Sequence, residues 1–217
     1  MPETVSHALI EKAAEAAEGS VTFLFQGGEP TLAGLDFYQD FVSYVKKTVP
    51  PGLAVHYAIQ TNGLALDERW CEFLGRNRFL VGVSLDGTRS LHDRLRPAAD
   101  GGATWSRGAA SLGRLRRHGV EPAVLCVLSS ELARHPQQVY RGLASLGARH
   151  VQFIPCLGPA EGGDGSPRSA EMASHALTPG RFVHFYRGFL DAWERGQAED
   201  GPMAVGLFDD VMGLSLG

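Results

Sequence analysis

Residues that could bind a small cationic group follow a short apolar run near the start of this 217-residue chain. The run is Val21–Phe25, and Gln26-Gly27-Gly28-Glu29-Pro30 comes directly after it. The two glycines let the chain turn tightly and bring bare backbone against a ligand. Pro30 holds Glu29 extended, so backbone carbonyls and one carboxylate gather at the end of a strand. This group suits an α-ammonium; a plain strand-to-helix turn is the alternative.

Three more apolar runs end in polar residues and glycine. They are Leu53–Gln60 before Thr61-Asn62-Gly63, Phe79–Leu85 before Asp86-Gly87, and His150–Cys156 before Leu157-Gly158-Pro159. β-Branched and aromatic residues dominate the first run, Val21–Phe25, which is typical of a buried strand, and the later runs are likewise apolar. Because functional groups gather where parallel strands end, we expect the polar clusters to meet at one edge of a sheet.

Helical periodicity alternates with these strands. The expected helices are Glu3–Glu18, Leu35–Thr48, Asp67–Gly75, Thr104–His118, Pro136–Leu146 and Thr178–Arg195, with a further strand at Glu121–Leu128 and loops at Asp86–Ala103 and Gly158–His175. Apolar runs without polar alternation indicate parallel strands covered on both faces. The predicted fold is therefore α/β, an incomplete parallel (β/α) barrel. A doubly wound sheet is the alternative, although the sequence has no glycine-rich phosphate loop.

Composition narrows the function classes. Hydrophobic residues at 44%, charged residues at 20% and a net charge of −4 are ordinary globular values and give no sign of nucleic-acid binding. No apolar segment approaches the roughly 20 residues that span a bilayer, and the polar, acidic amino terminus is not a signal peptide. Cys71, Cys126 and Cys156 fit no close-spaced metal motif, so we expect free thiols in a reducing cytoplasm.

Four ordered motifs together resemble the radical S-adenosylmethionine (radical SAM) proteins, and within them the anaerobic sulfatase-maturating enzymes. They are Gln26–Leu32 (QGGEPTL), Gln60–Gly63 (QTNG), Val83–Gly87 (VSLDG) and Gln152–Leu157 (QFIPCL). The resemblance covers nearly the whole chain. It implies a partial radical SAM (β/α) barrel over residues 1–158, a flexible loop over 159–177, and a helical segment over 178–217 that leads to a cysteine-rich domain.

The resemblance implies a binding site for S-adenosylmethionine at the first two strand ends. Gly27, Gly28 and Glu29 would hold the methionyl ammonium through backbone carbonyls and the carboxylate. Gln26 and Gln60 would line the cavity between the cofactor and a substrate peptide.

The later motifs would complete this site. Ser84 and Arg96 would meet the carboxylate and ribose of the cofactor, and Leu157 would pack on or near the adenine. A guanidinium matches a carboxylate bidentately, which agrees with the role given to Arg96. The alternatives are structural: Ser84 as a loop cap, Arg96 paired with Asp93 or Asp100, and Leu157 as plain core.

For the intact protein the resemblance implies oxidation of a Cys or Ser in a sulfatase polypeptide to Cα-formylglycine. A reduced [4Fe–4S] cluster would cleave S-adenosylmethionine, with ferredoxin or flavodoxin as electron donor. The cluster motif Cys-x3-Cys-x2-Cys is absent from the sequence. We expect it before Met1 and the auxiliary-cluster cysteines beyond Gly217, so the chain by itself would hold no cluster and no catalytic residue is assigned.

Three other functions stay open. One is a different radical SAM modification of a peptide. Another is a barrel enzyme without a cluster that uses Glu29, Asp86 and His92, which predicts a divalent metal site or a perturbed carboxylate pair at the barrel mouth. The third is a non-catalytic relative that binds a peptide or nucleotide.

Overall fold

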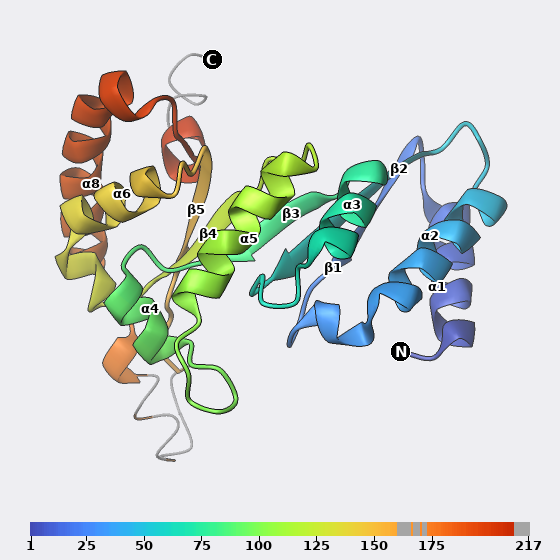
Figure 1. Ribbon diagram of the computed structural model, residues 1–217, viewed down its shortest axis with the longest axis horizontal. Helices are drawn as coiled ribbons and strands as arrows, with labels where there is room; N and C mark the ends of the chain where they lie inside the picture. The colour runs from blue at the N-terminus through green and yellow to red at the C-terminus, as the bar shows by residue number, and fades with distance from the viewer. Residues whose placement is uncertain (160–165, 167–169, 171–172, 211–217) are drawn as a thin grey trace. The chain divides into compact units, whose positions relative to one another are not determined.

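The computed structural model describes residues 1–159, 166, 170 and 173–210 (Figure 1). The chain divides into two compact units. The first comprises Met1–Val83 and Ala110–Pro122, and the second comprises Ser84–Ala109 and Ala123–Gly217. Each unit is built on parallel strands that neighbour one another in chain order, so the expected α/β fold with parallel strands is confirmed.

The first unit alternates helices with strands β1, β2 and β3. Its elements are α1 (Glu3–Ala16), β1 (Ser20–Phe25), the short 3₁₀ helix η1 (Pro30–Ala33), α2 (Leu35–Thr48), β2 (Ala54–Thr61), α3 (Glu68–Arg76), β3 (Leu80–Ser84, whose last residue is counted with the second unit) and the later part of α5 (Trp105–Arg117). The register pairs Phe25 with Ile59 and Thr61 with Val83. The carboxyl ends of β1 and β2 therefore lie at the same edge of the sheet.

An aromatic cluster fixes α2 against one face of β1. The rings of Phe23 and Phe25 lie edge-on to Phe41, with centroids 5.1 and 5.0 Å apart, and Phe25 lies 4.8 Å from Tyr38. The opposite face of β1 is accessible to solvent, as the 58% exposure of Leu24 shows. The prediction that the strands are covered on both faces is thus wrong for β1, where alternate side chains divide between the aromatic core and solvent.

The second unit holds β4, β5 and β6. Its elements are α4 (Arg89–Leu95), the beginning of α5, β4 (Ala123–Leu128), the 3₁₀ helix η2 (Leu132–Arg134), α6 (Pro136–Ser145), β5 (His150–Pro155), α8 (Pro179–Asp200) and β6 (Ala204–Val205). Leu128 pairs with Pro155, so β4 and β5 also end together. Phe153 of β5 packs edge-on to Phe185 and Phe189 of α8, at 4.9 and 5.0 Å. Helices α6 and α8 lie side by side (Figure 1).

Two sequence expectations were wrong in detail. The expected loop Asp86–Ala103 contains helix α4, whose seven residues show too little periodicity to stand out. The last helix runs to Asp200 instead of Arg195, and the short strand β6 and helical residues 206–210 follow it. The ring of Phe208 packs 5.3 Å from that of Trp193 of α8. Residues 211–217 of the expected helical segment, and most of the expected loop 159–177, lie outside the described residues.

Candidate functional site

The carboxylate of Glu29 binds the strand ends of the first unit together. Its Oε1 accepts hydrogen bonds from Thr31 N (3.1 Å), Thr31 Oγ1 (2.6 Å) and Thr61 Oγ1 (2.7 Å), and its Oε2 accepts one from Asn62 N (2.8 Å). The sequence expectation that the first two polar clusters meet is confirmed by these contacts. Sequence reasoning missed Thr31, Thr61 and Asn62 as partners of Glu29. The only signal was that they belong to the same two motifs.

The backbone next to Glu29 is open. Gly27 and Gly28 are exposed and have φ angles of 103° and 54°, and a Cβ built on either glycine would meet nothing within 4 Å. The glycines are therefore needed for the backbone conformation and not for packing. Their carbonyl groups accept no hydrogen bond within the described part of the chain. Gln26 is exposed and Gln60 half-buried, and both follow the paired residues Phe25 and Ile59.

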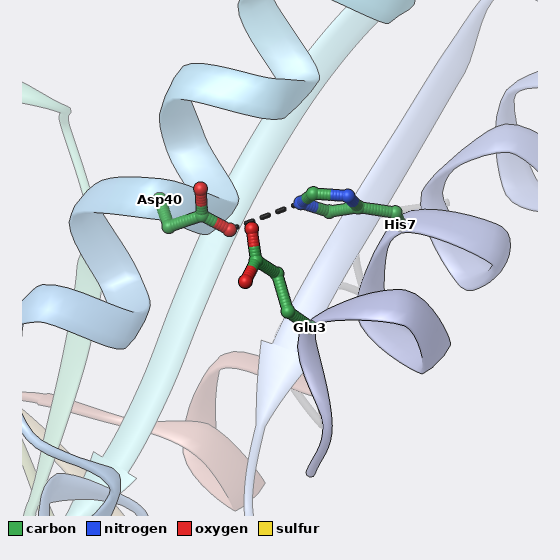
Figure 2. Close-up of side chains that lie close together, drawn as sticks. All are labelled: Glu3, His7 and Asp40. Atoms are coloured by element: carbon green, nitrogen blue, oxygen red, sulfur yellow. Dashed lines mark hydrogen bonds and ion pairs between the residues drawn. The ribbon is translucent and has the colours of Figure 1, made fainter.

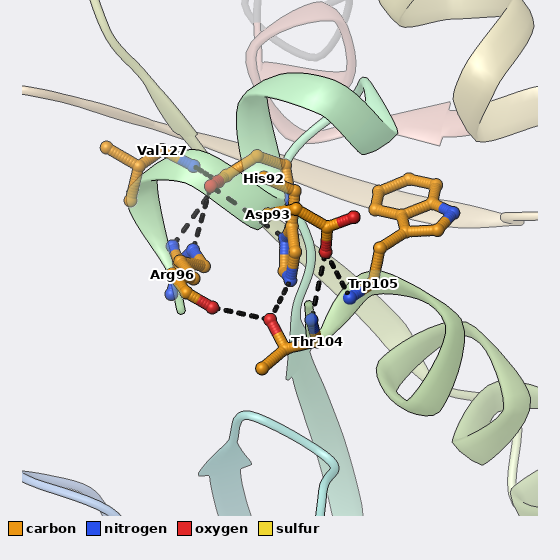
Figure 3. Close-up of polar contacts among 7 residues, drawn as sticks. His92, Asp93, Arg96, Thr104, Trp105 and Val127 are labelled. Carbon is orange, nitrogen blue, oxygen red and sulfur yellow. Dashed lines mark hydrogen bonds and ion pairs between the residues drawn. The ribbon is translucent and has the colours of Figure 1, made fainter. Parts of the chain in front are cut away.

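In the second unit, the buried carboxylate of Asp86 forms an ion pair with the guanidinium of Arg96. Asp86 is 2% exposed. Its Oδ2 accepts from Arg96 Nε (2.8 Å), and its Oδ1 accepts from Arg96 Nη2 (3.3 Å) and Val127 N (3.1 Å) (Figure 3). The structural partner of Arg96 is therefore Asp86, and neither Asp93 nor Asp100.

His92 completes this network as a neutral imidazole. Its Nδ1 accepts a hydrogen bond from Asp86 N at 3.2 Å, so that nitrogen carries no proton. The hydroxyl of Thr104 donates to the Arg96 carbonyl (2.5 Å), which leaves it to accept from His92 Nε2–H (3.1 Å; Figure 3). Burial lowers the pKa of His92; Arg96 lowers it further, and Asp86 and Asp93 oppose the shift.

Asp93 lies outside this network and binds the backbone at the start of α5. Its Oδ1 accepts from the backbone N–H groups of Thr104 (2.9 Å) and Trp105 (2.7 Å) at the start of α5, as Figure 3 shows. A carboxylate at this position satisfies donors that the first turn of a helix leaves unpaired. The loop between β3 and α5 is thus held at both ends by carboxylates, Asp86 and Asp93. Sequence reasoning missed Thr104 as the link between His92 and Arg96.

The other two expected cofactor residues differ in exposure. Ser84 is 8% exposed, whereas Leu157 is 75% exposed. Leu157 lines an open hollow of about 330 Å³ after β5, whose lining is mostly apolar: Pro155, Leu157, Leu177, Thr178, Pro179, Phe182 and Val183. No hydrogen bond or ion pair joins Ser84, Arg96 and Leu157 to one another among the described residues.

The cysteines do not fit an iron–sulfur cluster. Cys71, Cys126 and Cys156 are free, and the first two are buried. Burial raises the pKa of Cys71 to about 11 and also raises the pKa of Cys126, so neither favours the thiolate that ligates iron.

The side chains at the strand ends do not support the alternative hypothesis of a barrel enzyme without an iron–sulfur cluster. Within the described residues, the group that could hold a metal ion is Glu3, His7 and Asp40 on α1 and α2. Asp86 is held by a guanidinium and backbone, with His92 Nδ1 3.9 Å from Oδ2.

Comparisons with known proteins identify relatives along nearly the whole chain. No protein-family model matches it. It is 36% identical over 209 residues to a cysteine-type anaerobic sulfatase-maturating enzyme of Clostridium novyi, which covers 96% of this chain and 54% of the relative. It is 37% identical over 180 residues to a serine-type enzyme of Klebsiella aerogenes, which covers 83% of this chain and 42% of the relative.

Solved structures agree with these relatives. The structure described as "Native anSMEcpe with bound AdoMet and Cp18Cys peptide" matches with a TM-score of 0.87 and 32% identity, over 96% of this chain and 56% of that one. The chain spans about half the length of the curated relatives it matches. The likeness confirms the expected fold class, an incomplete parallel (β/α) barrel of the radical SAM type. By sequence and by fold, the chain belongs to the radical SAM superfamily, in the group of the anaerobic sulfatase-maturating enzymes.

Proposed function

We propose that this chain supplies the S-adenosylmethionine-binding residues of an enzyme that oxidises a Cys or Ser of a sulfatase polypeptide to Cα-formylglycine. The observation that carries the proposal is the match over 96% of the chain to a structure with bound AdoMet and a peptide. Relatives of both the cysteine type and the serine type match the chain, so the proposal includes either target residue.

The first unit offers the groups for the methionyl ammonium. The carbonyls of Gly27 and Gly28 are exposed acceptors. Glu29 Oε1 already accepts three hydrogen bonds, but Oε2 accepts one from Asn62 and has capacity for another donor. In this proposal Glu29 both joins the ends of β1 and β2 and presents Oε2 to the cation. Gln26 and Gln60 would face the substrate peptide.

The second unit offers groups for the rest of the cofactor. Asp86 takes Nε and Nη2 of Arg96, so Nη1 is the nitrogen left to meet the cofactor carboxylate. The hydroxyl of Ser84, a residue that is 8% exposed, would bind the same carboxylate end of the cofactor. The apolar hollow beside Leu157 suits the flat adenine ring. Bound S-adenosylmethionine supplies the precursor of the oxidant, and these residues orient it toward the substrate.

Other parts of the proposal rest on resemblance. The cluster would take its thiolates from outside these 217 residues, because the chain's own cysteines do not fit it. A ferredoxin or flavodoxin would deliver electrons in the cytoplasm, without nucleic-acid or membrane partners. Among the described helices, none is long and apolar enough to cross a bilayer.

The binding half of the proposal is tested by titrating S-adenosylmethionine into the chain by NMR. Shifts should appear at Gly27, Gly28 and residues lining the Leu157 hollow. Leu157→Ser should weaken binding, whereas Leu32→Ser, which changes a side chain that is 82% exposed and outside the proposed site, should not. Equal binding by both variants would remove Leu157 from the site.

The activity is tested by grafting this chain in place of the 209 matching residues of the Clostridium novyi relative. The grafted enzyme, reconstituted anaerobically, should convert a Cys-x-Pro-x-Arg or Ser-x-Pro-x-Arg peptide to the aldehyde, detected by mass spectrometry. A graft that folds and carries its iron but yields no aldehyde from either peptide would contradict the proposed reaction.

A further inference from the structure

A group of side chains outside the proposed cofactor site lies between helices α1 and α2. Glu3 and His7 project from α1, and Asp40 projects from α2 toward them, as Figure 2 shows. One ligand atom from each lies within 4.8 Å of the other two. His7 Nε2 is 3.0 Å from Asp40 Oδ2, within hydrogen-bond distance.

The sequence places these groups on facing stripes of the two helices. Glu3, His7 and Glu11 are four residues apart on α1, and Asp40 and Tyr44 are four apart on α2, so each set shares one helix face. Contacts follow in the same order along the two stripes. His7 meets Asp40, and the Tyr44 hydroxyl donates to Glu11 Oε1 at 2.5 Å.

The imidazole of His7 is held in position by stacking. Its ring lies 3.5 Å from the ring of Tyr44, with only 2° between their planes. Tyr44 is itself held by Glu11. Nε2 therefore points at Asp40 without help from a bound ion, although the two side chains remain partly open, at 23% and 45% exposure. The site is accessible, and one of its ligands needs little ordering on binding.

We propose that Glu3, His7 and Asp40 bind a divalent transition-metal ion of the Zn²⁺ class. An imidazole with two carboxylates is a donor set that suits Zn²⁺ and is poor for Mg²⁺ or Ca²⁺, which prefer oxygen alone. Ligands about 2.0–2.1 Å from a tetrahedral ion are separated by about 3.3 Å, so His7 Nε2 and Asp40 Oδ2 need to part by only a few tenths of an ångström.

The charges of the site also match a divalent ion. Two carboxylates and a neutral imidazole balance the charge of M²⁺, and His7 would bind the ion through Nε2 in the tautomer that carries its proton on Nδ1. Glu3 is exposed at the first turn of α1, so its carboxylate can swing to the ion without disturbing the core. Water would fill the fourth position. Such an ion would fasten α1 to α2.

The test is a titration of the chain with Co²⁺ and with Zn²⁺ alone. We expect Co²⁺ to bind at one site per chain with visible bands of a low-coordinate complex, Zn²⁺ to displace it, and the His7 ring signals to shift in NMR. Glu3→Gln and Asp40→Asn keep the side-chain shapes and should each weaken binding by at least the roughly 10- to 100-fold that loss of a supporting contact costs. His7→Ala should abolish it.

The matched control is His118→Ala. His118 also lies beside a carboxylate, 2.7 Å from Glu68 Oε2, but Arg117 takes the other oxygen of that carboxylate. This variant should bind Co²⁺ like the parent. Absence of binding, binding that survives His7→Ala, or equal loss in His118→Ala would each overturn the proposal. Helix content measured by circular dichroism separates loss of ligand from loss of fold.

Discussion

Removing Arg96 should destabilise the second unit severely, because it leaves a buried charge unpaired. The Asp86 side chain is 3% exposed and depends on two guanidinium nitrogens and Val127 N–H. Breaking a buried ion pair by deleting one partner costs about 3–5 kcal/mol. Arg96→Ala should therefore lower the free energy of unfolding by about this amount.

Replacing the other partner, Asp86, should lower the free energy of unfolding by less. Asp86→Asn leaves the guanidinium of Arg96, whose side chain is 29% exposed, so water can reach it. We expect a loss of about 1.5–3 kcal/mol, the value of hydrogen bonds to a charged group. In Asp86→Asn/Arg96→Ala the two losses should not add, because the double variant has no aspartate at position 86 to be left charged and unpaired.

Urea unfolding followed by circular dichroism measures all three variants. The exposed pair Arg76–Glu72, at 2.6 Å on α3, supplies the control, and Arg76→Ala should cost only about 0.3–0.5 kcal/mol. If Arg96→Ala cost no more than Arg76→Ala, the buried pair would not hold the loop and the reasoning would be refuted.

The result also decides how cofactor binding by Arg96 variants is interpreted. If an Arg96 variant binds S-adenosylmethionine weakly because it is partly unfolded, its affinity does not show whether Arg96 contacts the ligand. Arg96→Lys keeps the charge opposite Asp86 but loses the planar fork, so it separates the structural pair from recognition of a carboxylate. Lower affinity for S-adenosylmethionine at unchanged stability would identify Arg96 as a cofactor ligand.

Three further predictions concern positions that support the site. Burial lowers the pKa of His92 in the folded state below the ordinary histidine value of about 6.5, so its stabilising contribution is present above that value and is lost as the pH falls through the folded-state pKa. Urea midpoints should therefore drop as the pH is lowered below about 6.5, and His92→Gln should remove that drop. Gly142→Ala should destabilise by about 1–3 kcal/mol in thermal unfolding, since its Cβ would lie 2.1 Å from a backbone carbonyl oxygen, whereas Gly180→Ala, with nothing within 4 Å, should not; equal melting would contradict this. Thr61→Val removes the 2.7 Å donor to Glu29 and should lower the unfolding free energy by about 1.5–3 kcal/mol, a reasoning that an unchanged urea midpoint would overturn.

Local sequence determined most of the secondary structure of this protein. Helix α2 runs from Leu35 to Thr48 as its three- and four-residue periodicity predicts. Asp67 begins α3 as its N-cap, accepting from Trp70 N at 2.9 Å, and Thr178 does the same for α8. These features depend on residues a few positions apart, so the sequence alone contains their cause. Short elements such as β6, with only two residues, carry too little pattern to be predicted.

The partners of the charged side chains were decided only by the tertiary structure. Glu29 was expected to point at a ligand, yet most of its acceptor capacity is used by Thr31, Thr61 and Asn62. Arg96 was expected to meet a ligand or an acidic neighbour in its loop, and it pairs with Asp86. Apart from the local contact with Thr31, such contacts join distant positions: Glu29 and Asn62 are 33 residues apart, and Asp86 lies 10 residues from Arg96 and 41 from Val127. They depend on the register of parallel strands, which brings distant carboxylates and donors to the same sheet edge and which local periodicity does not specify.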